Sequence, residues 1–390
     1  MINSNKSKYS RNIWIVYLFN FFQGMMFFLP IYALYLQHDL FTALNVAIIL
    51  AVRTFCGVLF EIPLGAFADL FGRRKTLILS GLVSIIALIF LSIGGSMFIF
   101  ILYAILLALS RSLLNGTDTA LLFDSLKIMR KETNFQKIVS INNGAWQTGA
   151  AIGSIVGGVL AAVSLRLPVF YTFIPFTLAF IVAFFIIEPP YKKENHRNVF
   201  LHMSNTAKLL IRNGLLTLFF ATILLFAFSE VSFNFNSIFL DFKHIPLIYF
   251  GVVFALCFGL GFLSSFVSSH YLNKRFGDKN MLLVSIIGSP LMTILATLSS
   301  GVYCAGFIIL SSIFFNIRLP IIMDLYNKNT PSKNRATMLS CVSFGSTIGM
   351  ALYAPIFGYM VDLYNIGTAM QLTATFTIVA IVLVLFVKEK

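Results

Sequence analysis

The chain has 390 residues, of which 58% are hydrophobic and only 11% are charged, and its mean hydropathy is +0.90. This composition excludes a soluble protein. A bilayer core of about 30 Å is crossed by about 20 apolar residues, and runs of that length recur along the whole chain. The net charge of +14 does not indicate a nucleic-acid partner, because the cations lie in short loops between apolar runs. We therefore expect a chain surrounded by lipid.

Enzyme and metal-site motifs are missing from the sequence. The four cysteines lie in apolar runs without paired spacing, which fits neither a metal site nor a disulfide framework. Neither HExxH, nor Gly-x-Ser-x-Gly, nor a phosphate-binding loop occurs. We therefore expect no enzyme, no cofactor and no bound metal.

Twelve apolar segments follow one another and predict an all-α integral membrane protein with twelve transmembrane helices. The first segment is too long for a signal-peptide core and is expected to remain as a helix. The segments are 12–36, 42–68, 75–94, 97–121, 138–164, 167–188, 214–241, 247–273, 280–300, 302–326, 336–362 and 367–387.

The Lys and Arg residues predict the orientation of these helices. Of the 28 cations, 23 fall on the face that holds the N-terminus, two on the opposite face, and three inside helices. Because cytoplasmic loops are enriched in Lys and Arg, both termini are expected in the cytoplasm, in the cell membrane. Residues 189–213 form the longest polar stretch, which begins at Pro189 and Pro190. Part of it, 198–211, could be an amphipathic surface helix or a plain linker.

The loop after the second segment carries Gly65, Asp69, Gly72 and Arg73 at a characteristic spacing. It closely resembles the loop between helices 2 and 3 of the major facilitator superfamily, whose pattern is G-x-x-x-D-x-x-G-R-[KR]. The resemblance implies two pseudo-symmetric six-helix bundles, 1–188 and 214–390, joined by a cytoplasmic linker at 189–213. It also implies transport by alternating access.

An internal repeat agrees with this architecture. FGRRKTLILS at 71–80 aligns with FGDKNMLLVS at 276–285, an offset of 205. ALLFDSLK at 120–127 aligns with PIIMDLYN at 320–327, which superimposes Asp124 on Asp324. Matches at nearly constant offset suggest duplication of a six-helix unit.

The resemblance also gives Asp124 a role. In the superfamily an acid at this place pairs with the motif arginine, so Asp69, Arg73 and Asp124 would form a latch that holds the outward-facing state. In the second half Lys274 and Asp278 stand where Asp69 and Arg73 would fall. The charges are inverted there, and a latch in that half is expected to be different or weaker.

A stripe of small residues marks the fifth segment. Small residues four apart allow close helix packing in lipid, and the stripe also resembles the superfamily's antiporter signature, G-x-x-x-G-P-x-x-G-G. Ser154 replaces its proline, which weakens the inference to an exporter. The stripe consists of Gly149, Gly153, Gly157 and Gly158.

Charged residues inside the segments are the candidate functional residues, because charge at mid-bilayer is costly. In the superfamily helices 1, 4, 7 and 10 line the central cavity, which implies that Arg111, Asp118, Glu230 and Arg318 face it. Glu230 is the candidate proton carrier, or else a permanently ionised partner of Arg318 or Arg111. Glu61 is expected to pair with Arg53 or with helix 11, and otherwise to be a second titrating acid.

The remaining cavity is apolar and aromatic, with scattered polar points that include Asn20 and Gln23. Such a cavity suits an amphiphilic small molecule better than a sugar, which needs many fixed hydrogen bonds. The predicted function is proton-coupled efflux of an amphiphilic or drug-like compound. The alternative is proton-coupled uptake of a nutrient or other small solute. We expect the protein to act as a monomer.

Overall fold

The computed structural model describes residues 2–190, 215–268, 271, 273–331 and 334–385. This part of the chain is almost entirely helical and contains no β-strand. Ten of its helical segments are long and apolar enough to cross a membrane, and Leu167–Ala183 is a shorter apolar segment. The predicted all-α class is therefore confirmed. The surface helix considered for 198–211 lies outside the described residues.

The chain divides into two compact units. The first contains Met1–Ile31 and Phe55–Arg197, and the second contains Tyr32–Thr54 and Asn198–Lys390. Helix α3 (Ala43–Phe71) contributes its first part to the second unit and its remainder to the first. The sequence placed the whole of this helix in the N-terminal bundle.

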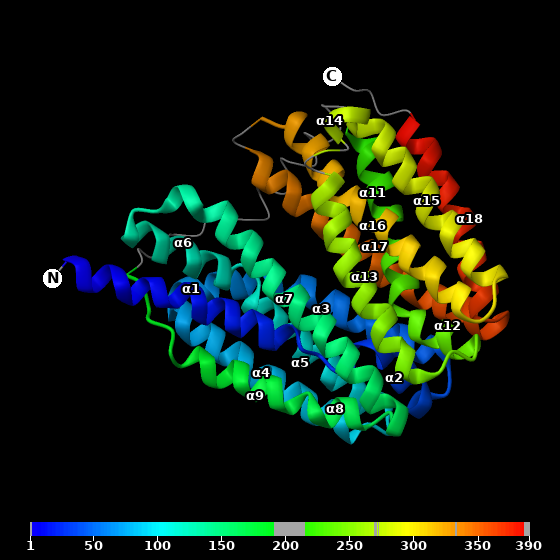
Figure 1. Ribbon diagram of the computed structural model, residues 1–390, viewed down its shortest axis with the longest axis horizontal. Helices are drawn as coiled ribbons and strands as arrows, with labels where there is room; N and C mark the ends of the chain where they lie inside the picture. The colour runs from blue at the N-terminus through cyan, green and yellow to red at the C-terminus, as the bar shows by residue number, and fades with distance from the viewer. Residues whose placement is uncertain (1, 191–214, 269–270, 272, 332–333, 386–390) are drawn as a thin grey trace. The chain divides into compact units, whose positions relative to one another are not determined.

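In the first unit α1 lies against α7, α9 and α6, while α4 lies against α5 and α9 (Figure 1). The helices of this unit, besides the end of α3, are α1 (Ile2–Gly24), η1 (Leu29–Ile31), α4 (Arg73–Ile93), α5 (Met97–Leu114), α6 (Thr117–Met129), η2 (Glu132–Asn134), α7 (Phe135–Val163), α8 (Leu167–Tyr171) and α9 (Phe173–Ala183).

In the second unit α11 lies against α17 and α18, while α15 lies against α16 and α18. Its helices, besides the start of α3, are α2 (Tyr32–Leu40), α11 (Leu216–Asn234), α12 (Asn236–Phe242), α13 (Leu247–Val267), α14 (Asn273–Phe276), α15 (Asp278–Leu298), α16 (Val302–Lys328), α17 (Arg335–Leu363) and α18 (Ile366–Leu385).

The packing inside the two units follows the same plan. The contacts α1–α7, α1–α9, α4–α5 and α4–α9 of the first unit correspond to α11–α17, α11–α18, α15–α16 and α15–α18 of the second. Corresponding helices occupy corresponding places in the chain, about 200 residues apart. The repeated packing is what duplication of a six-helix unit would produce.

Several predicted helices are broken in the structure. The first segment is interrupted after Gly24, and the fourth at Asn115 and Gly116, where Gly116 has φ +78°. The seventh is interrupted at Phe235. Hydropathy does not detect such breaks, because the interrupting residues leave the apolar run intact. Broken helices free backbone groups inside the membrane, and this is tolerated where protein or a cavity surrounds them.

Large apolar side chains form the core of each unit and also cover its outside. Phe19 and Leu121 are buried in the first unit, and Ile321 and Tyr326 in the second. Outside, bulky side chains such as Phe98 remain exposed. Lipid covers such side chains without the hydration penalty that water would impose.

Candidate functional site

The motif arginine holds α4 to α6. Arg73, the first residue of α4, forms an ion pair with Asp124 of α6, and its Nη1 also donates to the backbone carbonyl of Ala120. The side chains of the pair are only 14% and 17% exposed, so water screens the attraction little. Two of the three predicted latch side chains are therefore in contact. Asp69 and Gly65 belong to α3, but their surroundings lie outside the described part of the chain.

Glu188 completes this corner, and the sequence prediction missed it. Its Oε1 accepts the backbone N–H of Arg73 at 2.8 Å, and its Oε2 accepts that of Arg74 at 2.7 Å. A carboxylate suits this place, because the first N–H groups of a helix have no partner within the helix and carry partial positive charge. The only signal was an acid directly before Pro189 and Pro190.

The conformation of Gly72 explains the glycine of the motif. Its φ of +95° lies in the region that favours glycine, and a Cβ there would come within 3.3 Å of the Glu188 carboxylate. On the other side of Glu188, the Asn12 side chain accepts the N–H of Ile187 at 2.9 Å and donates to its carbonyl at 2.8 Å. The segment after α9 is thus fastened to both α1 and α4.

The corresponding corner of the second unit uses one lysine between two acids. Lys328 Nζ lies 2.6 Å from Asp278 and 2.6 Å from Asp324. Asp278 stands where the first unit has Arg73, which inverts the charge there, and Asp324 stands where it has Asp124. The Lys328 side chain is 58% exposed, and exposed ion pairs contribute little to stability. The side chain of Lys274 lies outside the described residues.

Asp118 sits in the first turn of α6, buried among nitrogen donors. Its carboxylate accepts Asn20 of α1 at 3.1 Å, Asn142 of α7 at 2.8 Å and the backbone N–H of Thr119 at 2.7 Å. Asn20 also donates to Asn142 at 2.9 Å. No cation lies within 4 Å of Asp118 among the described residues. Asn142 was missed, since one polar residue in an apolar helix does not show which way it faces.

Arg111 and Gln23 meet in another part of the first unit. Arg111 Nη2 lies 3.4 Å from the backbone carbonyl of Gln23 and 3.2 Å from the sulfur of Met26, and its guanidinium lies 5.9 Å from the ring centre of Trp146. The Gln23 side chain donates to Ser84 of α4 at 3.2 Å. Arg111 and Asp118 therefore have separate surroundings, although they are seven residues apart.

The glycine stripe of α7 lies against the end of α1 and the residues that follow it, Met25 to Phe27. A Cβ added at Gly149 would come within 2.1 Å of the Phe21 carbonyl oxygen, and one at Gly157 within 1.8 Å of the Phe27 carbonyl oxygen. Gly153 faces Met25, with its Cα only 3.0 Å from an added Cβ, and Gly158 is buried. The two backbones approach so closely that no side chain fits between them.

In the second unit Glu230 lies under the influence of two arginines, Arg53 of α3 and Arg318 of α16. No ion pair shorter than 4 Å joins Glu230 to a cation in the described part of the chain. Arg53 lies over the ring of Tyr32, 5.5 Å from its centre. The expected pairing of Arg53 with Glu61 is not seen among the described residues, and Glu61 is exposed.

Arg318 is completely buried in the second unit. Its Nε lies 3.3 Å from Ser285 Oγ of α15, and its Nη1 lies 3.2 Å from the Leu225 carbonyl and 3.0 Å from Ser229 Oγ of α11. The guanidinium also lies 5.0 Å from the ring centre of Phe315. Four helices, counting that of Arg53, thus bring the three interior charges of this unit into one region.

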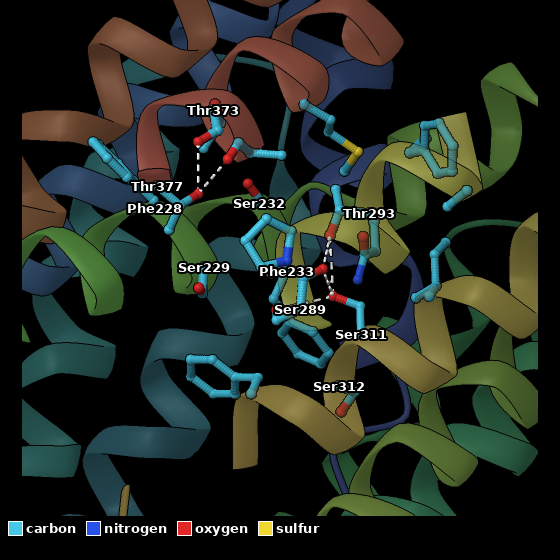
Figure 2. Close-up of a pocket in the computed structure, with 18 residues that line it drawn as sticks. Phe228, Ser229, Ser232, Phe233, Ser289, Thr293, Ser311, Ser312, Thr373 and Thr377 are labelled. Atoms are coloured by element: carbon cyan, nitrogen blue, oxygen red, sulfur yellow. Dashed lines mark hydrogen bonds between the residues drawn. The ribbon is translucent and has the colours of Figure 1, made fainter. Parts of the chain in front are cut away.

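A cavity of about 60 Å³ opens beside this region, between α11, α15, α16 and α18 (Figure 2). Its walls carry both aromatic rings and hydroxyl groups. Figure 2 shows Thr373 and Thr377 on one side, Ser289, Thr293 and Ser311 on the other, and Ser232 between them. Its hydroxyl-bearing residues are Ser229, Ser232, Ser289, Thr293, Ser311, Ser312, Thr373 and Thr377. The sequence prediction missed this set, because serine and threonine are common in membrane helices.

Most of these hydroxyls are bonded to each other or to the backbone. Ser311 Oγ lies 3.1 Å from Ser289 Oγ and 3.0 Å from Thr293 Oγ1. Ser312 donates to the Cys257 carbonyl at 3.1 Å, and Thr373 lies 2.6 Å from the Tyr353 hydroxyl. The hydroxyl of Ser232 has no hydrogen-bond partner among the described residues. The cavity can therefore offer a bound molecule both apolar contact and hydrogen bonds.

Comparison with known proteins identifies the family. The family model described as the Major Facilitator Superfamily matches residues 13–274 and 265–390. The chain is 26% identical over 387 residues to the uncharacterised MFS-type transporter YxaM of Bacillus subtilis (strain 168), covering 95% of this chain and 94% of that one. It is 21% identical over 398 residues to the uncharacterised MFS-type transporter MJ1560 of Methanocaldococcus jannaschii, covering 95% and 97%.

Two solved structures share the fold. A point mutant of the nucleoside transporter NupG matches with a TM-score of 0.83 and 14% identity, over 97% of this chain and 100% of that one. A bacterial homologue of the human lysosomal transporter Spinster, inward-facing and unoccupied, matches with a TM-score of 0.77 and 14% identity, over 97% and 96%. These likenesses agree with the twelve-helix arrangement expected from the sequence. The chain belongs to the major facilitator superfamily.

Proposed function

We propose that this protein is a proton-coupled secondary transporter in which Glu230 carries the proton. The observation that supports the proposal is the state of that side chain. The charges of Arg53 and Arg318 act on it, yet no cation lies within 4 Å of it in the described residues. A carboxyl held between desolvation and distant positive charge can exchange a proton without breaking an ion pair. Protonation would change its attraction to the arginines of two other helices.

The proposed substrate is a small amphiphilic molecule. Phe228, Phe233 and Phe315 supply apolar surface to the cavity, and eight hydroxyl-bearing residues supply hydrogen bonds. Ligand sites of this kind combine a mostly apolar wall with a few placed polar groups. Efflux of this molecule from the cell is the first candidate for the direction of transport.

Uptake of a polar solute is the second candidate, and the hydroxyl lining favours it. A nucleoside or similar solute carries several hydrogen-bonding groups, and the hydroxyls offer partners for them. NupG, which has the same fold, is a nucleoside transporter. At 14% identity the likeness gives the fold alone, so the lining carries this candidate.

A transport assay tests the proton coupling. Purified protein in liposomes is given an imposed pH gradient of either sign, and uptake of labelled candidate amphiphiles and nucleosides is followed. The wild type should concentrate a substrate under one sign only, which gives the direction. Glu230→Gln should keep substrate exchange without a gradient but lose accumulation, because it holds the protonated form. If Glu230→Gln still accumulates substrate at the wild-type rate, Glu230 is structural.

We also propose that both termini face the cytoplasm of the cell and that the monomer is the transporting unit. Cysteine labelling tests the orientation. Lys131 and Arg166 are loop residues predicted on opposite faces, and neither is in the cavity. In intact cells a membrane-impermeant thiol reagent should label Arg166→Cys and spare Lys131→Cys. Labelling of position 131 alone would reverse the proposed topology.

A further inference from the structure

The guanidinium of Arg318 has N–H groups for which the described structure provides no hydrogen-bond acceptor. Arginine has five N–H groups, and Nε and Nη1 provide three of them. Those atoms face Ser285, Leu225 and Ser229. Nη2, with the other two, is buried and has no hydrogen-bond partner in the described part of the chain. An unsatisfied charged donor is costly, so this atom is a place where an acceptor would bind strongly.

The charges of the second unit are unbalanced in the same region. Apart from Asp324, which pairs with Lys328, and from charges in the first and last turns, its described helices carry three charged side chains, namely Arg53, Glu230 and Arg318. Two positive charges therefore face one carboxylate, and protonation of Glu230 would remove even that. A buried charge without a counter-charge is unfavourable in a membrane protein. An anion bound here would restore neutrality.

The cavity lies next to this excess charge. Ser229, which accepts the Arg318 Nη1 donor, and Phe315, over which the guanidinium lies, both line the cavity. Ser232, one turn along α11 from Ser229, presents a hydroxyl without a partner among the described residues (Figure 2). Arginine and a serine hydroxyl are a favourable pair of donors for a carboxylate or phosphate oxygen.

We propose that the transported molecule carries an acidic group, a carboxylate or a phosphate, and that Arg318 binds it at the edge of this cavity. This inference rests on the proposed function, in which the cavity is the substrate site. The apolar wall would then hold the rest of the molecule.

Binding of matched probes to the full-length protein in detergent tests the inference. The probes are phenylacetate and phenyl phosphate, with neutral phenylacetamide for comparison, and the readout is the dissociation constant from calorimetry. The wild type should bind at least one acid about tenfold or more tightly than phenylacetamide, because a charge-assisted hydrogen bond is about twice as strong as a neutral one. Whichever of the two acids binds more tightly shows whether the carboxylate or the phosphate is the preferred group.

Three variants assign the preference to Arg318. Arg318→Gln should abolish the preference for acids, and Arg318→Lys should weaken acid binding about tenfold, because a single ammonium cannot replace the planar fork. Arg275→Gln removes an exposed cation of the same unit and should change nothing. If Arg318→Gln does not fold, Arg318→Lys and the wild-type probe comparison still decide the question.

Two results would overturn the inference: a wild type that binds no acid more tightly than phenylacetamide, or an arginine variant that keeps the full preference. The proposed function would survive either result if a pH gradient still drives accumulation of a neutral amphiphile. The proposed function would instead be overturned if no pH gradient drives transport of any probe, whatever the probes' binding constants are. The two proposals can therefore be distinguished.

Discussion

At the scale of single residues, the interior acids of the two units are stabilised in different ways. Asp118 is surrounded by three N–H donors from two asparagines and a backbone amide. Glu230 has no comparable donors among the described residues and lies in the field of two arginines. Hydrogen-bond donors in contact with a carboxylate favour its ionised form, and positive charges favour it too, but more weakly the farther away they lie. This contrast is why we assign coupling to Glu230 and a structural role to Asp118.

Replacing Asp118 tests that assignment. In Asp118→Asn one of the accepting oxygens becomes an NH₂ group that faces other donors, so buried N–H groups lose their acceptor. We expect a loss of about 1–3 kcal/mol in unfolding free energy, measured by denaturation in detergent.

The matched control is Asp324→Asn, which removes an acid of the same type from an exposed ion pair. Its effect should stay below about 1 kcal/mol. Equal stability of Asp118→Asn and the wild type would show that the donors do not need the carboxylate.

At the scale of elements, the contact of α7 with α1 and with the segment that follows α1 depends on the absence of side chains. At Gly157 an added Cβ would overlap the Phe27 backbone, whereas at Gly144 of the same helix an added Cβ meets nothing within 4 Å. Backbone atoms cannot rotate out of the way as a side chain can. A substitution at Gly157 must therefore push α7 away from the segment that follows α1.

Gly157→Ala should consequently lower both the yield of folded protein and its melting temperature, with a loss of about 1–3 kcal/mol in unfolding free energy as in other overpacked cores. Gly144→Ala makes the same chemical change in open space and should be neutral or slightly stabilising, because alanine favours helix over glycine. Similar melting temperatures for the two variants would contradict the packing described here.

The elements also show how much the sequence could predict. Hydropathy located the apolar helices because lipid imposes a length of about 20 residues on each. It could not locate the breaks near Gly24, Gly116 and Phe235, which depend on local backbone conformation. Charge made Arg73 and Glu230 visible as candidates. Their surroundings depend on neutral residues such as Asn142 and the cavity serines, whose direction is set by tertiary packing.

Glu188 was missed for a different reason. Its function depends on the backbone amides of Arg73 and Arg74, more than a hundred residues earlier in the chain. A backbone donor has no sequence signature, so no pattern could connect the two segments. Asp124 was assigned to Arg73 only because the family resemblance supplied that pairing.

At the scale of the whole molecule, each unit has a cluster of charged side chains, called here its ionic corner. It lies near the end of the fourth predicted helix in the first unit and of the tenth in the second. The first unit uses Arg73, Asp124 and Glu188, and the second uses Lys328 between Asp278 and Asp324. The first corner is the more buried of the two. We propose that it stabilises the outward-facing state more strongly than the exposed corner does.

Arg73→Ala should then shift the population toward the inward-facing state by about 1–3 kcal/mol, slow turnover and leave substrate affinity within a few fold. Turnover and dissociation constants measured on the same preparation check this. Lys75→Ala removes an exposed cation from the same loop and should leave turnover unchanged. If Arg73→Ala and Lys75→Ala turn over equally fast, the charge of the loop alone would matter and the latch would be dismissed.

The duplicated halves also differ in their tolerance of genetic change. In the first unit the close approach at Gly149 and Gly157 is between backbones. In the second, the nearest atoms to Gly345 and Gly349 of α17 belong to the side chains of Phe219 and Ile223. Those side chains can be exchanged for smaller ones. A larger residue at Gly345 or Gly349 can therefore be rescued by one compensating mutation on α11, a route of neutral divergence that Gly149 and Gly157 lack.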